Sequence, residues 1–193
     1  MLGVKIDKLT RACTPASGGV SRILLFDPND FDFTQDATTK SYTTVTKRKG
    51  AETTGFFVDI PFKRKEAEYK FNQSVGASGA AKYVHELTCL IASIGQAITN
   101  FLTNLDAASY CSGIGIAIQL NSGEVLIMGE AYVDGELIPS FWPEHNGSEG
   151  GSGKLFDDSN GVTVKIAADY SRALNSFTGG FQTLVDMTEP QQP

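Results

Sequence analysis

The chain has 193 residues, of which 41% are hydrophobic and 20% are charged, a balance typical of globular rather than disordered proteins. This length is enough for one domain with a sizeable core. The formal net charge is −6, which argues against a general nucleic-acid binder, because such proteins carry a basic surface. An acidic surface repels phosphate and suits a protein that must not stick to passing DNA.

The cysteines and the N-terminal residues bear on the compartment in which the chain folds. Cys13, Cys89 and Cys111 are widely spaced and form neither a disulfide framework nor a CxxC metal motif, so we expect a reducing cytoplasm. Residues 1–13 alternate apolar and charged side chains without an apolar core, which is not the pattern of a signal peptide. We expect residues 1–16 to form an N-terminal arm. No apolar run is long enough to span a membrane.

The first third of the chain is predicted to form strands separated by polar turns. Residues 20–26 are apolar and β-branched, and residues 31–34 alternate Phe with polar residues. Residues 40–46 and 53–62 are also rich in β-branched and aromatic residues, and a basic segment that ends in glycine joins them. This pattern predicts a long hairpin over residues 40–62. Another strand is expected over residues 68–73 because apolar and polar residues alternate there.

Apolar residues then recur at alternating spacings of three and four. They are Val84, Leu87, Ile91, Ile94, Ile98, Phe101, Leu102 and Leu105. Because this spacing places side chains on one face of a helix, the sequence predicts one long amphipathic helix at about 78–106, with Ser78 as its N-cap. The apolar stripe of such a helix must be covered by a sheet or by another copy of the chain.

The second half of the chain contains the clearest hairpin signal. Residues 113–120 and 124–131 flank the turn Asn121-Ser122-Gly123, and the first of them alternates strictly. Residues 133–160 are rich in Gly, Ser and Pro, and a loop of that length is typical of a functional or mobile segment. Residues 161–170 predict a last strong strand.

The end of the chain completes the predicted architecture. A weaker strand is expected near residues 181–185, before an extended C-terminal tail at 186–193. We therefore expect a single domain over residues 1–193, of the α+β class and mainly β. Its predicted form is a β-sandwich or partial barrel of antiparallel strands with one long flanking helix.

No group of residues in the sequence is typical of a reaction centre. The two histidines, His85 and His145, have no HExxH or CxxC partner, and the aspartates at 27–32 and 157–158 fit turn chemistry better than a calcium loop. We therefore expect no catalytic residues, no metal and no cofactor, and we expect that the chain is not an enzyme.

Two segments are candidates for binding. The first is the predicted hairpin, whose tip carries Lys47, Arg48 and Lys49 and whose returning strand carries Phe56, Phe57 and Val58. The basic tip suits solubility or docking onto an acidic patch of an identical neighbour. The apolar strand either packs in the core or is completed by another subunit. The second segment is the long loop, where Trp142 is a candidate for binding a ligand.

The order of elements resembles one known family. An early strand follows Gly18-Gly19, a strand ends in Phe71-Asn72-Gln73, a helix follows, and then comes the tight hairpin. A Gly-rich stretch runs into residues 155–161 (LFDDSNG) and the final strand. Over roughly residues 14–170, this order is similar to that of the tail tube proteins of tailed bacteriophages.

The resemblance implies a structural role in the virion. Subunits would join into rings, usually hexameric, and the rings would stack through the long hairpin and the termini into a channel for genome ejection. The partners would be the chain itself and other phage tail or neck proteins, with DNA only as cargo that does not stick. The protein would be made in the host bacterial cytoplasm and located in the virion tail.

Two other functions fit the same sequence. A tail terminator or a head–tail or neck joining protein would form a single ring and stop there. A β-sandwich binding module would instead grip a carbohydrate or a protein through Trp142.

Overall fold

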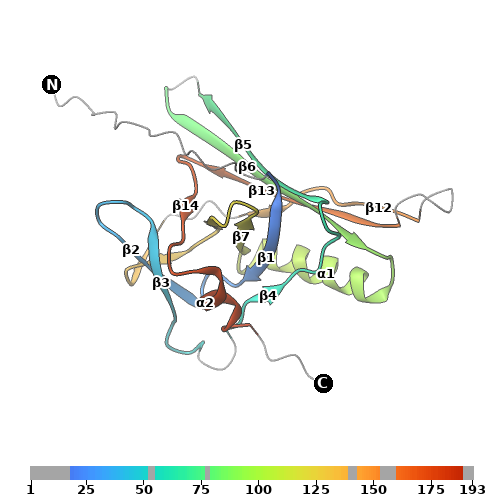
Figure 1. Ribbon diagram of the computed structural model, residues 1–193, viewed down its shortest axis with the longest axis horizontal. Coiled ribbons are helices and arrows are strands. Elements are labelled where there is room, and N and C mark those ends of the chain that lie inside the picture. Colours follow the sequence, from blue (N-terminus) through green and yellow to red (C-terminus); the bar gives the residue numbers. More distant parts are fainter. Residues whose placement is uncertain (1–17, 52–54, 77–78, 139–142, 153–159, 189–193) are drawn as a thin grey trace.

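The computed structural model describes residues 18–51, 55–76, 79–138, 143–152 and 160–188 (Figure 1). Within these residues the fold is mainly β, with largely antiparallel sheets and two helices. The predicted class, α+β and mainly β, is confirmed, whereas the finer description as a sandwich or partial barrel stays a prediction. The predicted N-terminal arm and the end of the predicted C-terminal tail lie outside the described residues.

A central sheet of five strands organises the fold, and neighbouring strands in it are antiparallel. Across the sheet the order is β14 (Asn175–Ser176), β8 (Val125–Met128), β7 (Gly115–Leu120), β1 (Val20–Phe26) and β4 (Val58–Asp59). The strand predicted at 20–26 and the tight hairpin predicted over 113–131 are confirmed.

Two further sheets, one of four strands and one of five, complete the fold. The β2–β3 sheet runs in the order β10 (Glu136–Leu137), β9 (Tyr132–Val133), β2 (Phe31–Gln35) and β3 (Tyr42–Lys47). The β5–β6 sheet runs in the order β11 (Glu144–His145), β13 (Gly161–Tyr170), β6 (Ala81–Ala92) and β5 (Ala67–Val75), and β12 (Glu149–Gly151) also pairs with β13. The strand predicted at 161–170 is confirmed.

Both faces of the central sheet are buried. On β7, Ile116 and Ile118 belong to a hydrophobic cluster that includes Leu87 of β6 and Val164 of β13, whereas Ala117 belongs to a second cluster with the β2–β3 sheet. A strand covered on both faces has a nearly continuous apolar sequence, which explains the run of apolar residues in β7.

The second cluster is rich in aromatic rings. Phe57 has no exposed surface, and its ring centroid lies 5.0 Å from that of Phe26 and 4.5 Å from that of Phe31. Phe181 and Leu184 of the short helix α2 (Phe181–Val185) are buried in the same cluster. The strand predicted at 181–185 is therefore wrong, because these two side chains reach the cluster at a helical spacing of three.

The long helix predicted at about 78–106 is wrong in its first half. Residues 81–92 form strand β6, and only Gln96–Cys111 form a helix, α1. Leu87 and Ile91 of the predicted helical stripe also fit a period of two, since His85, Leu87, Cys89 and Ile91 are buried and their neighbours are not. Pairing of β6 with both β5 and β13 satisfies its backbone groups on two sides, and this long-range pairing overrides the helical pattern.

The long hairpin predicted at 40–62 is also absent. β3 pairs with β2, from Phe31↔Lys47 to Gln35↔Tyr42, while β4 pairs with β1. The chain reverses at Asp36, whose Oδ1 accepts the N–H groups of Thr38 at 2.9 Å and Thr39 at 2.7 Å. This local turn brings β2 and β3 together and leaves β4 to pair with β1 of the central sheet.

Candidate functional site

Strands β5 and β6 form a hairpin that extends beyond the rest of the molecule (Figure 1). At its base, Leu87, Cys89 and Ile91 are buried against the central sheet. Towards its tip the side chains are exposed, with exposed fractions of 51% for Phe71 and 67% for Val75. The hairpin therefore offers large apolar side chains on a projection that the core does not cover.

The outer edge of β5 is open. β5 is the last strand of its sheet, and no other described strand pairs with that edge. Leu90 donates its N–H to the carbonyl of Glu66 at 2.9 Å, so in the antiparallel ladder the even-numbered residues of β5 bond to β6. The odd-numbered residues, including Phe71 and Gln73, then direct their N–H groups outward. An open edge of nine residues is a template for pairing with another chain.

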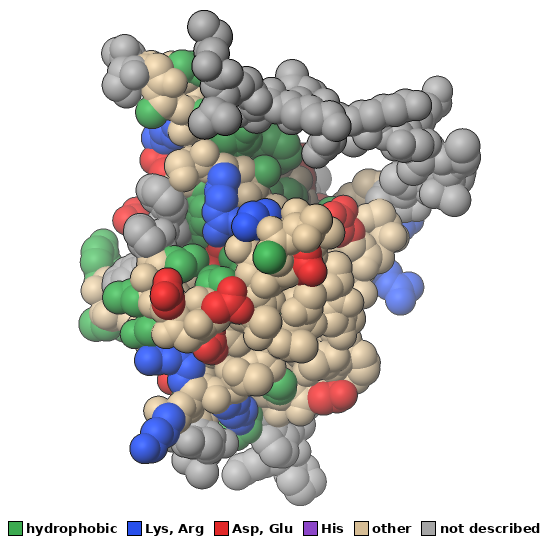
Figure 2. Space-filling view, turned by 90° about the vertical axis from the view of Figure 1, so that its left-hand side faces the viewer, with side chains coloured by type: hydrophobic (Ala, Val, Ile, Leu, Met, Phe, Trp, Pro, Cys, Tyr) green, Lys and Arg blue, Asp and Glu red, His purple; other side chains and the backbone are tan. Residues whose placement is uncertain are grey.

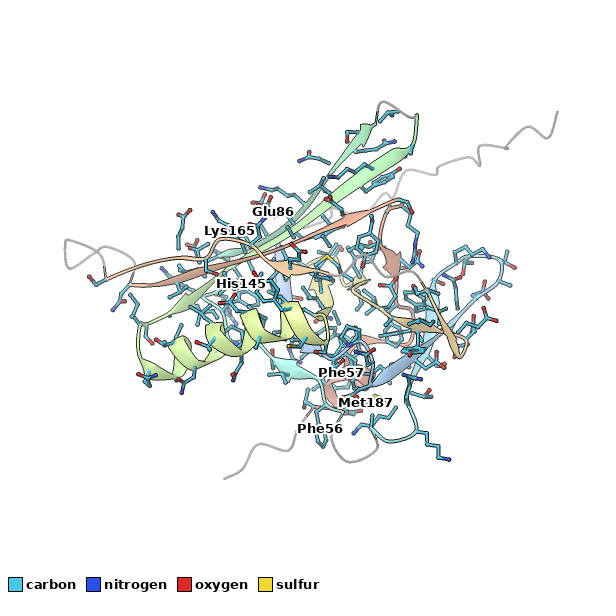
Figure 3. The ribbon with its side chains drawn as sticks, turned by 180° about the vertical axis from the view of Figure 1, so that it is seen from behind. Phe56, Phe57, Glu86, His145, Lys165 and Met187 are labelled. Atoms are coloured by element: carbon cyan, nitrogen blue, oxygen red, sulfur yellow. The ribbon has the colours of Figure 1, made fainter. Side chains whose placement is uncertain are left out.

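The solvent face of the β5–β6 sheet is charged. Its charged residues, identified by alternation with the buried ones, are Glu68, Lys70, Lys82, Glu86, Glu144, Glu149, Lys165 and Asp169. Five carboxylates against three lysines make the face net acidic by two charges. Figure 3 shows Glu86 and Lys165 on the side of this sheet that faces away from α1.

Cross-strand ion pairs organise this charged face. Lys70 lies 3.0 Å from Glu86, Lys82 lies 2.5 Å from Asp169, and Lys165 lies 3.1 Å from Glu149. Because all three pairs are largely open to water, each contributes little to stability. These pairs keep the face polar, and each lysine is engaged by a carboxylate of the same chain.

The opposite edge of this sheet is fastened to α1 through His145. The Nδ1 of His145 lies 2.5 Å from Oδ1 of Asp106, its Nε2 contacts the hydroxyl of Ser148, and its backbone N–H donates to Oγ of Ser109 at 3.1 Å. A series of side-chain contacts from Asp to His to Ser also occurs in the catalytic triads of serine hydrolases. Catalysis there also needs a substrate cavity and hydrogen-bond donors for the oxyanion. The three cavities described below do not include these residues. We interpret the contacts as an attachment of β11 to α1.

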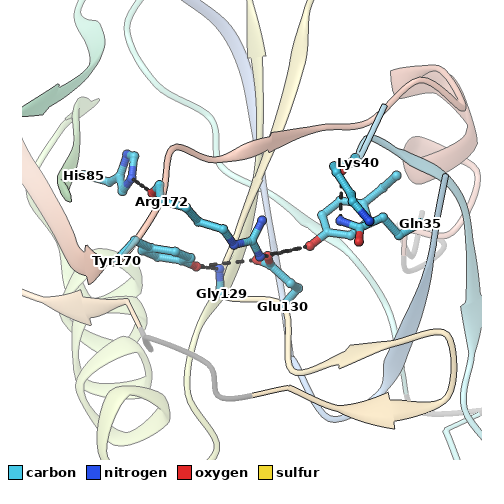
Figure 4. Close-up of polar contacts among 8 residues, drawn as sticks. Gln35, Lys40, His85, Gly129, Glu130, Tyr170 and Arg172 are labelled. Atoms are coloured by element: carbon cyan, nitrogen blue, oxygen red, sulfur yellow. Dashed lines mark hydrogen bonds and ion pairs between the residues drawn. The ribbon is translucent and has the colours of Figure 1, made fainter. Parts of the chain in front are cut away.

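A buried polar network connects the sheets around Glu130 (Figure 4). The Glu130 carboxylate accepts hydrogen bonds from the Tyr42 hydroxyl at 2.6 Å and from Nη2 of Arg172 at 2.8 Å. The Tyr170 hydroxyl lies 3.5 Å from its other oxygen and accepts the N–H of Gly129 at 2.6 Å. Burial raises the pKa of Glu130, while the bonds from Tyr42 and Arg172 oppose that rise.

His85 extends this network into the β5–β6 sheet. Its Nε2 lies 3.1 Å from the carbonyl of Arg172, and its Nδ1 lies 2.8 Å from the Tyr69 hydroxyl. Because a carbonyl can only accept, Nε2 carries the proton and Nδ1 accepts from Tyr69. Burial lowers the pKa of His85, so the fold favours the neutral ring. The sequence pattern placed this residue on a helix, whereas it is fully buried on β6.

The basic residues of the predicted hairpin tip contact aromatic rings of the same chain. Nζ of Lys47 lies 4.0 Å from the centre of the Phe56 ring, and the guanidinium carbon of Arg48 lies 3.3 Å from that of Tyr132. Nη1 of Arg48 also donates to the carbonyl of Asn29 at 2.9 Å. Lys49 is exposed. Two of the three cations are therefore held against the β2–β3 side of the molecule.

The apolar residues predicted for self-assembly lie in different environments in the structure (Figure 3). Phe57 is buried in the aromatic cluster, so for this residue the alternative of packing in the core is correct. Phe56 is half-buried, and 49% of Val58 is exposed on the edge strand β4. Trp142 lies outside the described residues.

The described residues also define three cavities that bear on binding. The first, of about 330 Å³, is mostly apolar and lies between α1 and the end of β1. The second, of about 570 Å³, borders Arg22, Arg64 and Lys65. The third, of about 480 Å³, borders Lys40 and Arg172.

Three further features of the described residues concern metal binding, membrane spanning and the buried thiol. There, no three His, Cys, Asp or Glu side chains are grouped so that they could hold a metal ion. No described helix has the length and apolar character needed to cross a membrane. Cys89 is buried as predicted, and burial raises the pKa of its thiol to about 12.

Comparison of the chain with family models, with curated proteins and with solved structures found no match.

Sequence reasoning missed the β5–β6 hairpin and the Glu130 network. A signal for the hairpin was present, because Leu87, Cys89 and Ile91 recur at a spacing of two, which is also the period of a strand. The only signal for the network was a carboxylate, Glu130, two residues after the end of the apolar strand β8.

Proposed function

We propose that this chain is a self-assembling structural subunit, most specifically a tail tube subunit of a tailed bacteriophage. The observation that carries the proposal is the open nine-residue edge of β5 on a projecting hairpin with exposed Phe71 and Val75. Soluble proteins normally shorten, charge or cover such an edge, and pairing with another copy covers it. In this proposal the β5–β6 hairpin takes the bridging role first expected for residues 40–62.

The geometry of the β5–β6 sheet supports ring formation. Its two edges differ, since β5 lies at one end and the short strands β11 and β12 lie at the other. Pairing of one edge with the different edge of the next copy is a heterologous contact, and such contacts close into rings when the rotation between copies allows it. Each ring would then be lined by a continuous sheet.

The charge of the same sheet supports a DNA channel. Its solvent face carries five carboxylates and three lysines, and three cross-strand ion pairs occupy those lysines. A net acidic surface repels the phosphates of passing DNA and keeps the duplex from sticking. The net charge of −6 for the whole chain agrees in sign.

Negative-stain electron microscopy of the purified protein across a concentration series tests this proposal. We expect hollow tubes of stacked rings. Isolated rings at every concentration would favour a tail terminator or a head–tail joining protein, in which the ring does not stack. A monomer at the highest concentration would contradict both structural roles.

A matched pair of variants at Gln73 tests the role of the β5 edge. Gln73 is exposed and directs its N–H outward, so Gln73→Pro removes an edge donor without removing a bond to β6. We expect Gln73→Pro to abolish assembly while the unfolding transition stays close to that of the parent chain. Gln73→Ala keeps the donor and should assemble normally. Assembly of the proline variant would exclude this edge as the interface.

A further inference from the structure

The cavity of about 480 Å³ beside Arg172 has a polar wall and an apolar wall. The polar wall includes Lys40, Arg172 and Asn175, and the apolar wall includes Val133, Ile138 and Leu174. Its volume lies within the range of small-molecule sites, which commonly combine an apolar lining with a few converging polar groups. Figure 2 views the side of the molecule that carries the β2–β3 turn and shows two groups of basic side chains separated by acidic ones.

The guanidinium of Arg172 is held in place from one side. Its Nη2 donates to Glu130 at 2.8 Å and lies 3.4 Å from the Tyr42 hydroxyl, while 40% of the side chain remains exposed. Its Nη1 and Nε make no hydrogen bond to the described residues. A guanidinium fixed in this way keeps the N–H groups of Nη1 and Nε to donate to a ligand, and a carboxylate oxygen is a suitable acceptor for either.

Lys40 is held at the same cavity by its backbone. It has a φ of +61°, in the left-handed region that a lysine seldom adopts. Its N–H donates to the carbonyl of Asp36 at 2.9 Å, and its carbonyl accepts from the Gln35 side chain at 2.9 Å (Figure 4). Such strain often accompanies functional positions.

The charge on Lys40 is available to a ligand. Its ammonium makes no hydrogen bond or ion pair with the described residues. The carboxylate of Asp36 interacts with it electrostatically, but Oδ1 of Asp36 is already occupied by the N–H groups of Thr38 and Thr39.

Asn175 supplies an independent observation. Its Nδ2 is buried, and no described group accepts a hydrogen bond from it. A buried donor without an acceptor destabilises a fold, so such a group calls for an explanation. Asn175 lines the cavity, but its Nδ2 has almost no surface open to water, so a ligand in the cavity reaches this atom only if the side chain turns towards it.

We propose that this cavity binds an organic carboxylate with a short apolar body. The carboxylate lies between the Arg172 guanidinium and the Lys40 ammonium, and the apolar body packs on Val133, Ile138 and Leu174. Glu130 pairs with Arg172 from the buried side, so Arg172 contributes hydrogen-bond donors and Lys40 supplies the net positive charge at the cavity. This site is separate from the β5 edge and stands whether or not the chain assembles.

Isothermal titration calorimetry of the full chain with sodium hexanoate tests the site. We expect saturable binding with a dissociation constant of about 1 mM or tighter. Hexan-1-ol, which lacks the charge, and inorganic phosphate, which lacks the apolar body, should each bind at least about tenfold more weakly. Equal binding of phosphate would overturn the assignment to an apolar carboxylate, and equal binding of hexanol would overturn the role of the cations.

Matched variants locate the binding. Lys40→Gln should weaken hexanoate binding by roughly tenfold, whereas Lys49→Gln removes another exposed lysine charge and should leave hexanoate binding unchanged. Arg172→Lys keeps the charge and removes the planar set of N–H donors, and it should weaken binding by a similar factor. The absence of saturable binding, or binding unaffected by both Lys40→Gln and Arg172→Lys, would overturn the proposal.

Discussion

The two ends of strand β6 belong to regions with opposite properties. At one end, Leu87 and Ile91 are buried between the central sheet and the β5–β6 sheet, while at the other end the strand leaves the body as part of a hairpin. Phenylalanine shows the contrast most clearly, since Phe57 in the body has no exposed surface and Phe71 on the hairpin is half exposed. The body therefore carries the stability of the fold, whereas the hairpin presents a surface.

The forces that hold the two regions also differ. In the body, side chains from three sheets pack on both faces of the central sheet. Beyond the body, the hairpin is held by its own ladder and by cross-strand contacts such as Lys70–Glu86 and the rings of Phe71 and Tyr83, whose centroids are 6.2 Å apart. Such contacts contribute only tenths of a kcal/mol to about 1 kcal/mol each. Substitutions should accordingly affect stability in the body and assembly in the hairpin.

The largest effect is expected in the aromatic cluster. Phe57→Ala removes a fully buried ring that contacts Phe26 and Phe31, and it should lower the free energy of unfolding by about 3–5 kcal/mol. Phe56→Ala, one residue earlier and half-buried, should cost less than about 1.5 kcal/mol. Urea unfolding followed by circular dichroism measures both. Similar losses at the two positions would contradict the assignment of Phe57 to the core.

The Glu130 network should give the next largest effect. Arg172→Met leaves the Glu130 carboxylate buried without its cation, and because Arg172 is partly exposed we expect a loss of about 1–3 kcal/mol. Adding Glu130→Gln to the Arg172→Met variant should recover part of the lost stability. Arg22 pairs with Asp59 at 2.7 Å near the surface, so Arg22→Met is the control, with an expected change within about 0.5 kcal/mol. Chemical denaturation of the three variants and the parent chain would show whether burial of the carboxylate decides the difference.

His85 should make the body sensitive to acid. Burial depresses its pKa in the folded state, so the unfolded chain binds the proton more readily. Stability from this group is fully present above the unfolded pKa of about 6.5 and is lost as the pH falls below that value towards the folded pKa. The raised pKa of Glu130 acts in the opposite sense.

The comparison of His85→Gln with the parent chain isolates the contribution of this histidine. Melting temperatures measured from pH 7.5 to 5 should fall less steeply with acid in the variant. Parallel curves for the two proteins would show that His85 does not take up a proton selectively on unfolding.

The smallest effect on stability is expected on the hairpin. Phe71→Ser exchanges an exposed side chain and should change the free energy of unfolding by no more than about 0.5 kcal/mol. If the β5–β6 hairpin mediates assembly, the same variant should form fewer and shorter tubes by electron microscopy. Val58→Ser, at an exposed position on β4, an edge strand of the central sheet, is the control. Loss of tubes only in the Val58 variant would move the interface to β4.

The sequence predicted local elements correctly where residues typical of turns mark the ends of a strand. The strand at 20–26 precedes Asp27-Pro28, and the strands of the tight hairpin flank Asn121-Ser122-Gly123, so pattern and turn chemistry agreed there. It failed at residues 81–92, where apolar residues satisfy a helical and a strand period together. It also failed at 40–62, because two adjacent β-rich segments need not pair with each other.

The sequence by itself determined that the chain is mainly β, that its surface is acidic, and which side chains are apolar enough to be buried. Only the tertiary structure decided which strands pair, because pairing depends on neighbours far apart in the chain, such as β6 with β13. That choice left β5 as an open edge, buried Glu130 and His85, and brought Lys40 and Arg172 to one cavity. None of these consequences has a local cause, since each depends on residues brought together from several strands and loops.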